Sequence, residues 1–212
     1  MFKLYGYPRS RSTRVLWTLE EAGAPYEYVL VNLQKGEQRQ PKYLSLNPVG
    51  KVPTLVDGDF VLTESGAICT YIGERAPEFR LVPASLTRER AEYDRWLFFV
   101  IGELEQPLWT LAKHTFALPK SLRVPAIMPT AKKEFRRAAA ALATALGDRE
   151  FVVGNGFTAA DIIITHTLLW ARGFEVPLEF ANLEAYADRH SARPGLARAQ
   201  EREHSAAAAA DA

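Results

Sequence analysis

Histidine and cysteine carry much of the metal and redox chemistry of proteins, and this 212-residue chain has few of either. Its four histidines lie far apart, without a cysteine cluster beside them (His114, His166, His190 and His204). This spacing predicts no metal site. The single cysteine, Cys69, allows no intrachain disulfide and fits a reducing cytosol. Within the helical pattern AICTYI we interpret it as a small buried hydrophobe, which disfavours disulfide exchange on an enzyme cysteine.

A proline interrupts the strand-like stretch NPVGKVPTL, residues 47–55. Proline has no N–H to give to a sheet, and it belongs at strand starts, edges or bulges. A cis Val52–Pro53 bond would turn the chain sharply and leave the backbone of Val52 for a partner outside the sheet. We therefore expect this bond to be cis.

Hydroxyl and acidic residues precede two predicted helices. Ser10, Ser12 and Thr13 lie between the first strand and the first helix, whereas Glu64 and Ser65 lie directly before GAICTYIGERA. A helix start offers unpaired N–H donors and the positive end of the helix dipole, which suit a carboxylate. Ordinary helix capping is the other interpretation of these residues, and the two roles are compatible.

One further acid, Asp161 in GNGFTAADIIITHTLLW, has the residue type of a catalytic acid or base. Thr158 lies three residues before it, which completes a capping box, and Phe157 and Ile162 have the spacing of a hydrophobic staple. The residues that follow are apolar nearly all round, so the helix is predicted to be buried and its first N–H groups need local partners. We interpret Asp161 as a helix cap.

The elements that position these residues change in character near residue 80. Before it, strand patterns at FKLYGY, YEYVLVNL, residues 52–56 and FVLT alternate with helical patterns at STRVLWTLEEAG and TESGAICTYIGERA. Gly23 is placed to end the first helix. The first strand–helix–strand unit implies a parallel pair, and the turn DGDF adds an antiparallel hairpin.

After residue 80 only helical periodicity is convincing, with Pro107 expected to kink or break one helix. We therefore expect an α/β domain over residues 1–77, a linker over 78–86 and an all-helical domain over 87–212. The alanine-rich end, residues 205–212, is expected to be a disordered tail.

Composition narrows the possible partners. Apolar residues make up 48% and charged residues 24% of the chain, as in ordinary globular proteins. The net charge of +1 predicts neither a nucleic-acid nor a membrane partner. No apolar run approaches the roughly 18 residues of a membrane span, and the first residues do not have the pattern of a signal peptide.

Three segments together, YGYPRSRSTRVLWTLEEAG, NPVGKVPTLVDGDFVLTESGAI and GNGFTAADI, closely resemble the cytosolic glutathione S-transferases, most closely the serine-type bacterial members similar to the theta, phi and zeta classes. The resemblance covers nearly the whole chain. It implies an N-terminal thioredoxin-like domain that binds glutathione and a C-terminal helical bundle that supplies most of the second-substrate pocket. It also implies a homodimer that joins glutathione to a hydrophobic electrophilic small molecule, with peroxide reduction as a possible second activity.

The same resemblance implies roles for two pairs of residues. The backbone of Val52, before Pro53, would pair with the cysteinyl unit of glutathione as an added strand. Ser65 would take the γ-glutamyl carboxylate, and Glu64 would pair with the ammonium group beside it.

The glycyl end of glutathione is implied to contact Gln38 and Lys51. Lys51 offers a point charge for the glycyl carboxylate. The segment around Gln38 has no firm local pattern, so Arg39 and Lys42 stay open as substitutes for it.

The chemistry implied by the resemblance depends on a thiolate. A free thiol has a pKa near ~8.5, and a hydroxyl that donates to the sulfur near a helix start favours the ionised form. Serine-type members use a serine a few residues before the arginine that matches Arg14, which places Ser10 in this role. Ser12 is the alternative serine, and Tyr5 or Tyr7 would serve in a tyrosine-type member.

A scaffold protein that has kept the fold and lost the chemistry is the competing class. The retained set of Ser10, Val52–Pro53 and Glu64–Ser65 favours the enzyme, because a scaffold has no need of a glutathione cradle. An RNA or DNA binder is disfavoured by the near-neutral charge and the lack of a basic stripe.

Overall fold

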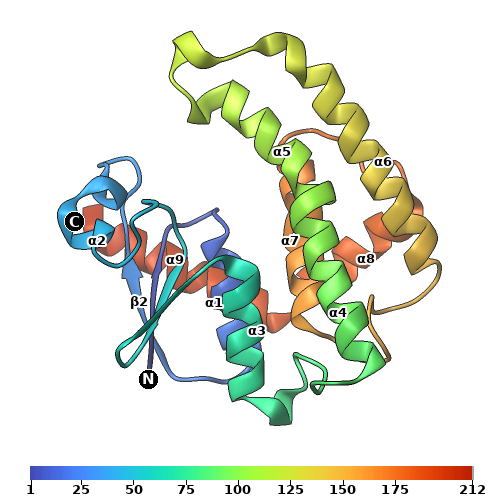
Figure 1. The fold of residues 1–212 in the computed structure, drawn as a ribbon, viewed down its shortest axis with the longest axis horizontal. Coiled ribbons are helices and arrows are strands. Elements are labelled where there is room, and N and C mark those ends of the chain that lie inside the picture. The colour runs from blue at the N-terminus through green and yellow to red at the C-terminus, as the bar shows by residue number, and fades with distance from the viewer. Residues whose placement is uncertain (212) are drawn as a thin grey trace. The chain divides into compact units, whose positions relative to one another are not determined.

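The computed structural model describes residues 1–211, and they divide into two compact units. The first unit holds Met1–Val82 together with the chain from Ala192 onward, and the second holds Pro83–Ser191. The strands all lie in the first unit, whereas the second is built from helices (Figure 1). The expected combination of an α/β part and an all-helical part is confirmed.

Four short strands form the sheet of the first unit: β1 (Phe2–Gly6), β2 (Tyr26–Leu30), β3 (Thr54–Asp57) and β4 (Phe60–Thr63). Their order is β2-β1-β3-β4; β1 is parallel to β2, and the other two pairs are antiparallel. Helices α1 (Ser12–Glu21) and α3 (Ser65–Arg75) pack beside each other, and a short helix, α2 (Pro41–Leu44), precedes β3. This is the expected thioredoxin-like arrangement.

Two strands are shorter than the sequence pattern predicts. The stretch 26–33 pairs only as far as Leu30, because Asn32 Oδ1 accepts bonds of 3.0 Å from the N–H groups two and three residues later and turns the chain. The strand expected from residue 52 begins at Thr54. Pro53 has no N–H to donate, so pairing starts after it.

The last helix, α9 (Pro194–Asp211), belongs to the first unit and packs along α1 and β2. Residues 87–212 were expected to form one helical domain, so this placement differs from the prediction. The expected disordered tail over 205–212 is corrected as well, since residues 205–211 are helical; residue 212 lies outside the described part of the chain. A run of alanines, the best helix former, accounts for the extension.

The second unit consists of α4 (Arg88–Phe99), α5 (Glu105–Ala112), α6 (Met128–Leu146), α7 (Ala159–Gly173) and α8 (Ala181–Ser191). A π-helical turn over Val100–Leu104 joins α4 to α5, so the helical path continues past Pro107 instead of breaking. Such a turn is one recognised way in which a helix adjusts around an irregularity. Within residues 1–211, no helix is long and apolar enough to span a bilayer.

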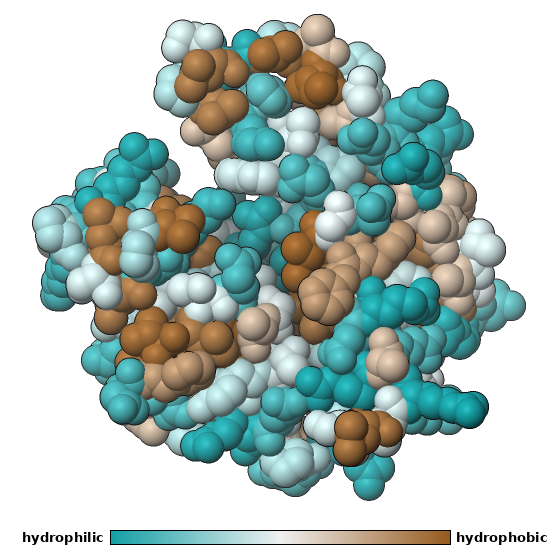
Figure 2. Space-filling view, in the orientation of Figure 1, coloured by the Kyte–Doolittle hydropathy of each residue, from teal (hydrophilic) through white to brown (hydrophobic). Residues whose placement is uncertain are grey.

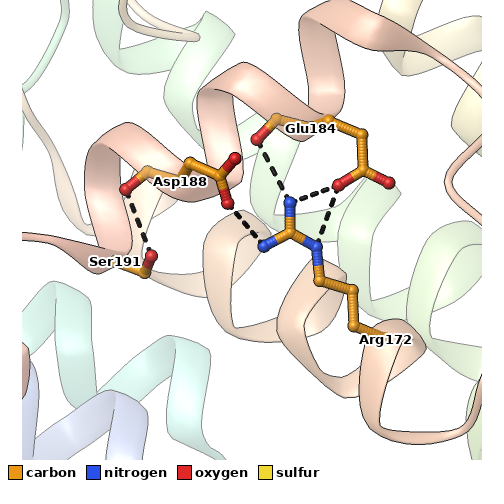
Figure 3. Close-up of polar contacts among 4 residues, drawn as sticks. All are labelled: Arg172, Glu184, Asp188 and Ser191. Atoms are coloured by element: carbon orange, nitrogen blue, oxygen red, sulfur yellow. Dashed lines mark hydrogen bonds and ion pairs between the residues drawn. The ribbon is translucent and has the colours of Figure 1, made fainter.

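Arg172 on α7 makes hydrogen bonds and ion pairs to α8 (Figure 3). Its guanidinium donates to the Glu184 carboxylate and main-chain carbonyl, and it also donates to Asp188 Oδ1 at 2.7 Å. The planar fork of an arginine suits two acceptors one helical turn apart.

The buried start of α7 is organised by Asp161, which is fully buried. Its Oδ2 accepts bonds of 2.8 Å from the N–H and the hydroxyl of Thr158, and its Oδ1 accepts from the N–H of Val152 (2.9 Å) and the hydroxyl of Tyr186 (2.6 Å). All four bonds satisfy groups of the fold itself. The interpretation of Asp161 as a cap is confirmed.

We expect Asp161→Ala to lower the free energy of unfolding by about 3–5 kcal/mol, because it leaves several buried hydrogen-bond donors without an acceptor. Asp161→Asn keeps one carbonyl oxygen and should lose less. Urea denaturation measures both variants, with Asp148→Ala at an exposed position as the control, expected within about 0.5 kcal/mol of wild type. An Asp161→Ala protein as stable as wild type contradicts the assignment.

A second buried carboxylate, Glu203 on α9, is only 2% exposed. Three groups face it: the hydroxyl of Thr13 on α1, the backbone N–H of Arg9 and the phenol of Tyr28 on β2. Burial raises the pKa of Glu203 to about 7, although the bonds from Thr13 and Arg9 act to lower it. The folded protein therefore holds this proton more tightly than the unfolded chain does.

The sign of the resulting pH dependence follows from that pKa. The contribution of protonated Glu203 to stability is fully present below the ordinary pKa of 4.5, and it is lost as pH rises through about 7. Relative to Glu203→Gln, wild type should lose roughly 2 kcal/mol of unfolding free energy between pH 5 and pH 8. Urea denaturation at the two pH values tests this, with the exposed Glu201→Gln on the same helix as the matched control. Equal slopes for wild type and Glu203→Gln would show that the carboxylate titrates normally.

Candidate active site

The strand register brings three site segments to one end of the sheet. Tyr5 on β1 lies opposite Thr54 on β3, and Thr54 lies opposite Thr63 on β4. The chain leaves β1 into the turn 7–11, enters β3 from Val52–Pro53 and leaves β4 into Glu64–Ser65. Segments that are far apart in the sequence therefore meet at the same end of the sheet.

The turn after β1 contains both candidate serines. Ser10 Oγ lies 2.6 Å from the carbonyl of Tyr7 and 2.9 Å from Ser12 Oγ, and it accepts a bond from the Ser12 N–H. Ser12 Oγ also accepts from the Tyr7 N–H. Ser12 is fully buried, whereas Ser10 is partly exposed. Ser12 therefore closes the turn from inside, and Ser10 is the more accessible of the two serines.

Gly6 has no side chain, and this lets the turn pack closely against the end of β1. A Cβ built on Gly6 would meet Ser12 Cβ and the ring of Tyr28, each at 2.8 Å. Any larger residue would push the turn away from the sheet. Tyr5, the other strand residue proposed as a thiol activator, has its ring centroid 6.1 Å from that of Tyr43.

The Val52–Pro53 bond is cis, as expected from the sequence. Tyr43 and Asn47 hold the loop before it, since the Tyr43 hydroxyl (2.6 Å) and the Asn47 side-chain amide (2.8 Å) both donate to the Lys51 carbonyl. Within residues 1–211, the backbone N–H and C=O of Val52 make no hydrogen bond to the protein. The fixed loop thus presents an unused backbone donor and acceptor, as a strand edge does.

Glu64, directly before α3, has an unusual backbone conformation. Glu64 has φ 67°, ψ 112°, a backbone geometry that costs a non-glycine residue on the order of 1–3 kcal/mol. It is exposed, whereas Ser65 is 5% exposed. The N–H groups of the first helical turn lie next to Ser65 and form a site that suits a carboxylate.

Arg14 connects this helix start to the serine turn. It lies on α1, is fully buried, and its guanidinium donates to Ser65 Oγ at 3.4 Å. From the sequence, Arg14 was expected only to mark the position of the serines. Its place within the apolar helical stretch TRVLW is the signal that this arginine has a structural or functional partner inside the fold.

Gln38 and Lys51 lie on neighbouring loops. Gln38 is in a 3₁₀ turn, Glu37–Arg39, and its backbone carbonyl lies 2.9 Å from where a Cβ of Gly50 would be. Lys51 follows Gly50 and is exposed, as are Arg39 and Lys42. The adjacency of Gln38 and Lys51 supports their common assignment, which stays a prediction.

Cys69 is excluded from chemistry at this site. It is fully buried within α3, and burial raises the pKa of its thiol to about 11, against smaller lowering effects of Thr18 and Arg14. The interpretation as a small buried hydrophobe is confirmed. In the described part of the chain, His, Cys, Asp and Glu form no group that could hold a metal ion.

Comparison with known proteins identifies both parts of the chain. Residues 1–74 match the N-terminal domain of glutathione S-transferase, and residues 88–198 match its C-terminal domain. A zeta-class glutathione S-transferase of Euphorbia esula is 44% identical over 115 residues, 54% of this chain and 50% of that protein. In that alignment the chain spans about half the length of its relative.

Two longer alignments extend the likeness. A glutathione S-transferase of Xanthomonas campestris pv. campestris is 31% identical over 188 residues, 88% of this chain and 91% of that protein. A glutathione transferase of Phanerochaete chrysosporium, solved with oxidized glutathione, superposes with a TM-score of 0.87 at 27% identity, covering 96% of this chain and 95% of that one. On these matches and on its fold, the chain belongs to the glutathione S-transferase family.

Proposed function

We propose that this protein is a glutathione transferase that activates the thiol of glutathione for attack on a small hydrophobic electrophile. The observation that carries the proposal is the meeting of the Ser10 turn, the cis Val52–Pro53 bond and the Glu64–Ser65 helix start at one end of the sheet. A solved relative that holds oxidized glutathione supports the choice of ligand.

Each part of glutathione has a matching protein group at this end of the sheet or on the loop beside it. The unused backbone N–H and C=O of Val52 suit the peptide backbone of the cysteinyl unit. The γ-glutamyl carboxylate suits Ser65 and the N–H groups at the start of α3, and its ammonium suits the exposed carboxylate of Glu64. The glycyl carboxylate suits the exposed Lys51, with Gln38 beside it.

Ser10 is the residue that we assign to thiol activation. Its hydroxyl can rotate from the Tyr7 carbonyl to donate to the sulfur, and it lies just before α1, whose dipole favours an anion. Ser12 positions Ser10 from the buried side of the turn. The buried guanidinium of Arg14 adds a positive charge within the same unit.

Two reactions follow from a bound thiolate. In conjugation the sulfur forms a bond to the electrophilic carbon, and the leaving group departs with the bonding electron pair. In peroxide reduction the sulfur forms a bond to one peroxide oxygen, the O–O bond breaks, and the alcohol leaves while glutathione becomes a sulfenic acid. The thiol of a second glutathione then attacks that sulfur, which gives the disulfide and water. Both use the protein in the same way, to bind glutathione and stabilise its thiolate.

Substitution of the serines tests this assignment. Ser10→Ala should bind glutathione in calorimetry much as wild type does, while the pKa of the bound thiol rises by about one to two units, the worth of one charge-assisted hydrogen bond. Thiolate absorbance against pH measures that pKa, and Ser45→Ala on an exposed loop is the control. Loss of ionisation in Ser12→Ala alone would transfer the role to Ser12, and survival in both would transfer it to Tyr5 or Tyr7. A wild type that binds no glutathione would favour the scaffold class.

We also propose that the protein is a homodimer. The edge strand β4 exposes Phe60 and Val61, and the α4 region exposes Phe98, at 79%, and Ile101. Apolar side chains also gather in patches on the otherwise polar face in Figure 2. Where exposed apolar side chains form a contiguous patch, that patch is typical of an association surface.

Sedimentation equilibrium at micromolar concentration should give twice the chain mass. Phe98→Glu should shift the equilibrium toward monomer by at least about tenfold, because it places a charge in an apolar interface. Phe116→Glu, at another exposed apolar position, serves as the matched control. A wild type that sediments as a monomer at this concentration is the contrary result.

A further inference from the structure

We propose that Glu203, on the last helix, is a positioning residue that holds the thiol-activating turn from the side opposite the ligand. This inference rests on the proposed function. Glu203 is separated by 190 residues from Thr13, which it contacts, and nothing in its local sequence marks it out.

Glu203 makes one of the polar contacts that tie α9, and Arg193 directly before it, to α1. At the far end of α1, Arg193 pairs with Glu21 (2.7 Å) and Arg198 pairs with Glu20 (2.7 Å). These two are ordinary partly exposed ion pairs between helices. At the N-terminal end of α1 the contact is of another kind. There α9 supplies the buried carboxylate of Glu203 instead of an exposed arginine, and its partner on α1 is the hydroxyl of Thr13.

The partners of Glu203 bracket Ser10. The Thr13 hydroxyl lies 2.9 Å from Oε1 and 3.1 Å from Oε2, and the Arg9 N–H also bonds to this carboxylate. One contact is therefore one residue before Ser10 and the other is three residues after it. Arg9 has φ 55°, a left-handed conformation that is uncommon outside glycine, so its backbone needs an external restraint.

An ionised carboxylate at this position has a cost to fold stability. Its surroundings are two dipolar donors and a phenol, and an unpaired buried charge is costly. A glutamine or a leucine would avoid that cost. A single carboxylate can instead accept from both sides of the turn at once, which fixes the direction of the Ser10 hydroxyl between them.

The charge of Glu203 and its geometry act in opposite directions on the thiol. An anion near the start of α1 disfavours a second anion there, so removing the charge alone should lower the pKa of the bound thiol. Removing the restraint should raise that pKa, because the hydroxyl no longer points steadily at the sulfur. The sign of the change therefore separates the two roles.

Two variants test the proposal: Glu203→Leu, which removes the acceptor, and Thr13→Val, which removes one donor and leaves the charge. The pKa of bound glutathione, read from thiolate absorbance, should rise by about one unit in both, roughly a tenfold loss of thiolate at neutral pH. The double variant should be no worse than the more affected single variant, because the two residues act as a unit. Glu201→Gln, exposed on the same helix, is the control.

A second measurement requires no glutathione. Amide hydrogen exchange over residues 7–13 of the ligand-free protein should lose at least about tenfold protection in both variants, while the strand amides of β1 and β3 keep theirs. If wild type binds no glutathione, the proposed function fails, and the exchange result still shows whether Glu203 holds the turn. A fall in the thiol pKa of Glu203→Leu, with Thr13→Val unchanged, or unchanged exchange in both variants, overturns the proposal.

Discussion

The antiparallel register of β3 against β1 and β4 is the constraint on which the candidate site depends. It sets Tyr5, Thr54 and Thr63 side by side, and each is within a few residues of one part of the proposed glutathione cradle. A shift of one residue would turn the side chains of β3 to the other face and move the cis Val52–Pro53 segment along the edge. The buried apolar side chains of β1 and β3, such as Leu4 and Leu55, fix the register because one face must be covered.

Three buried or strained groups hold the segments that the strand register brings together. Arg14 reaches from α1 to Ser65, Glu203 reaches from α9 to Thr13, and Glu64 holds a left-handed φ at the start of α3. Each is unfavourable in isolation, since a charge leaves water or a backbone leaves its preferred region. The surrounding packing sustains all three, and their concentration near one end of the sheet is typical of a functional site.

The helical unit contrasts with this arrangement. Its buried acid, Asp161, has all its acceptor positions used by Thr158, Val152 and Tyr186, so it stabilises the start of α7 and has no capacity left for chemistry. Residue type alone cannot tell such an acid from a catalytic one. The spacing of the capping box could, because both of its partners lie within three residues of one another.

The sequence by itself determined the features that depend on near neighbours. The alternation of strands and helices, the helix end at Gly23, the proline at the start of β3 and the cap at Asp161 are all written in short segments. Contacts across long separations were decided only by the tertiary structure. These include the burial of Ser12 beneath Ser10, the partner of Arg14, and the return of α9 to α1, which brings Glu203 under the turn. The physical reason is that hydrogen bonding within a turn or helix is fixed by spacing, whereas the burial of a given hydroxyl or charge depends on which distant element covers it.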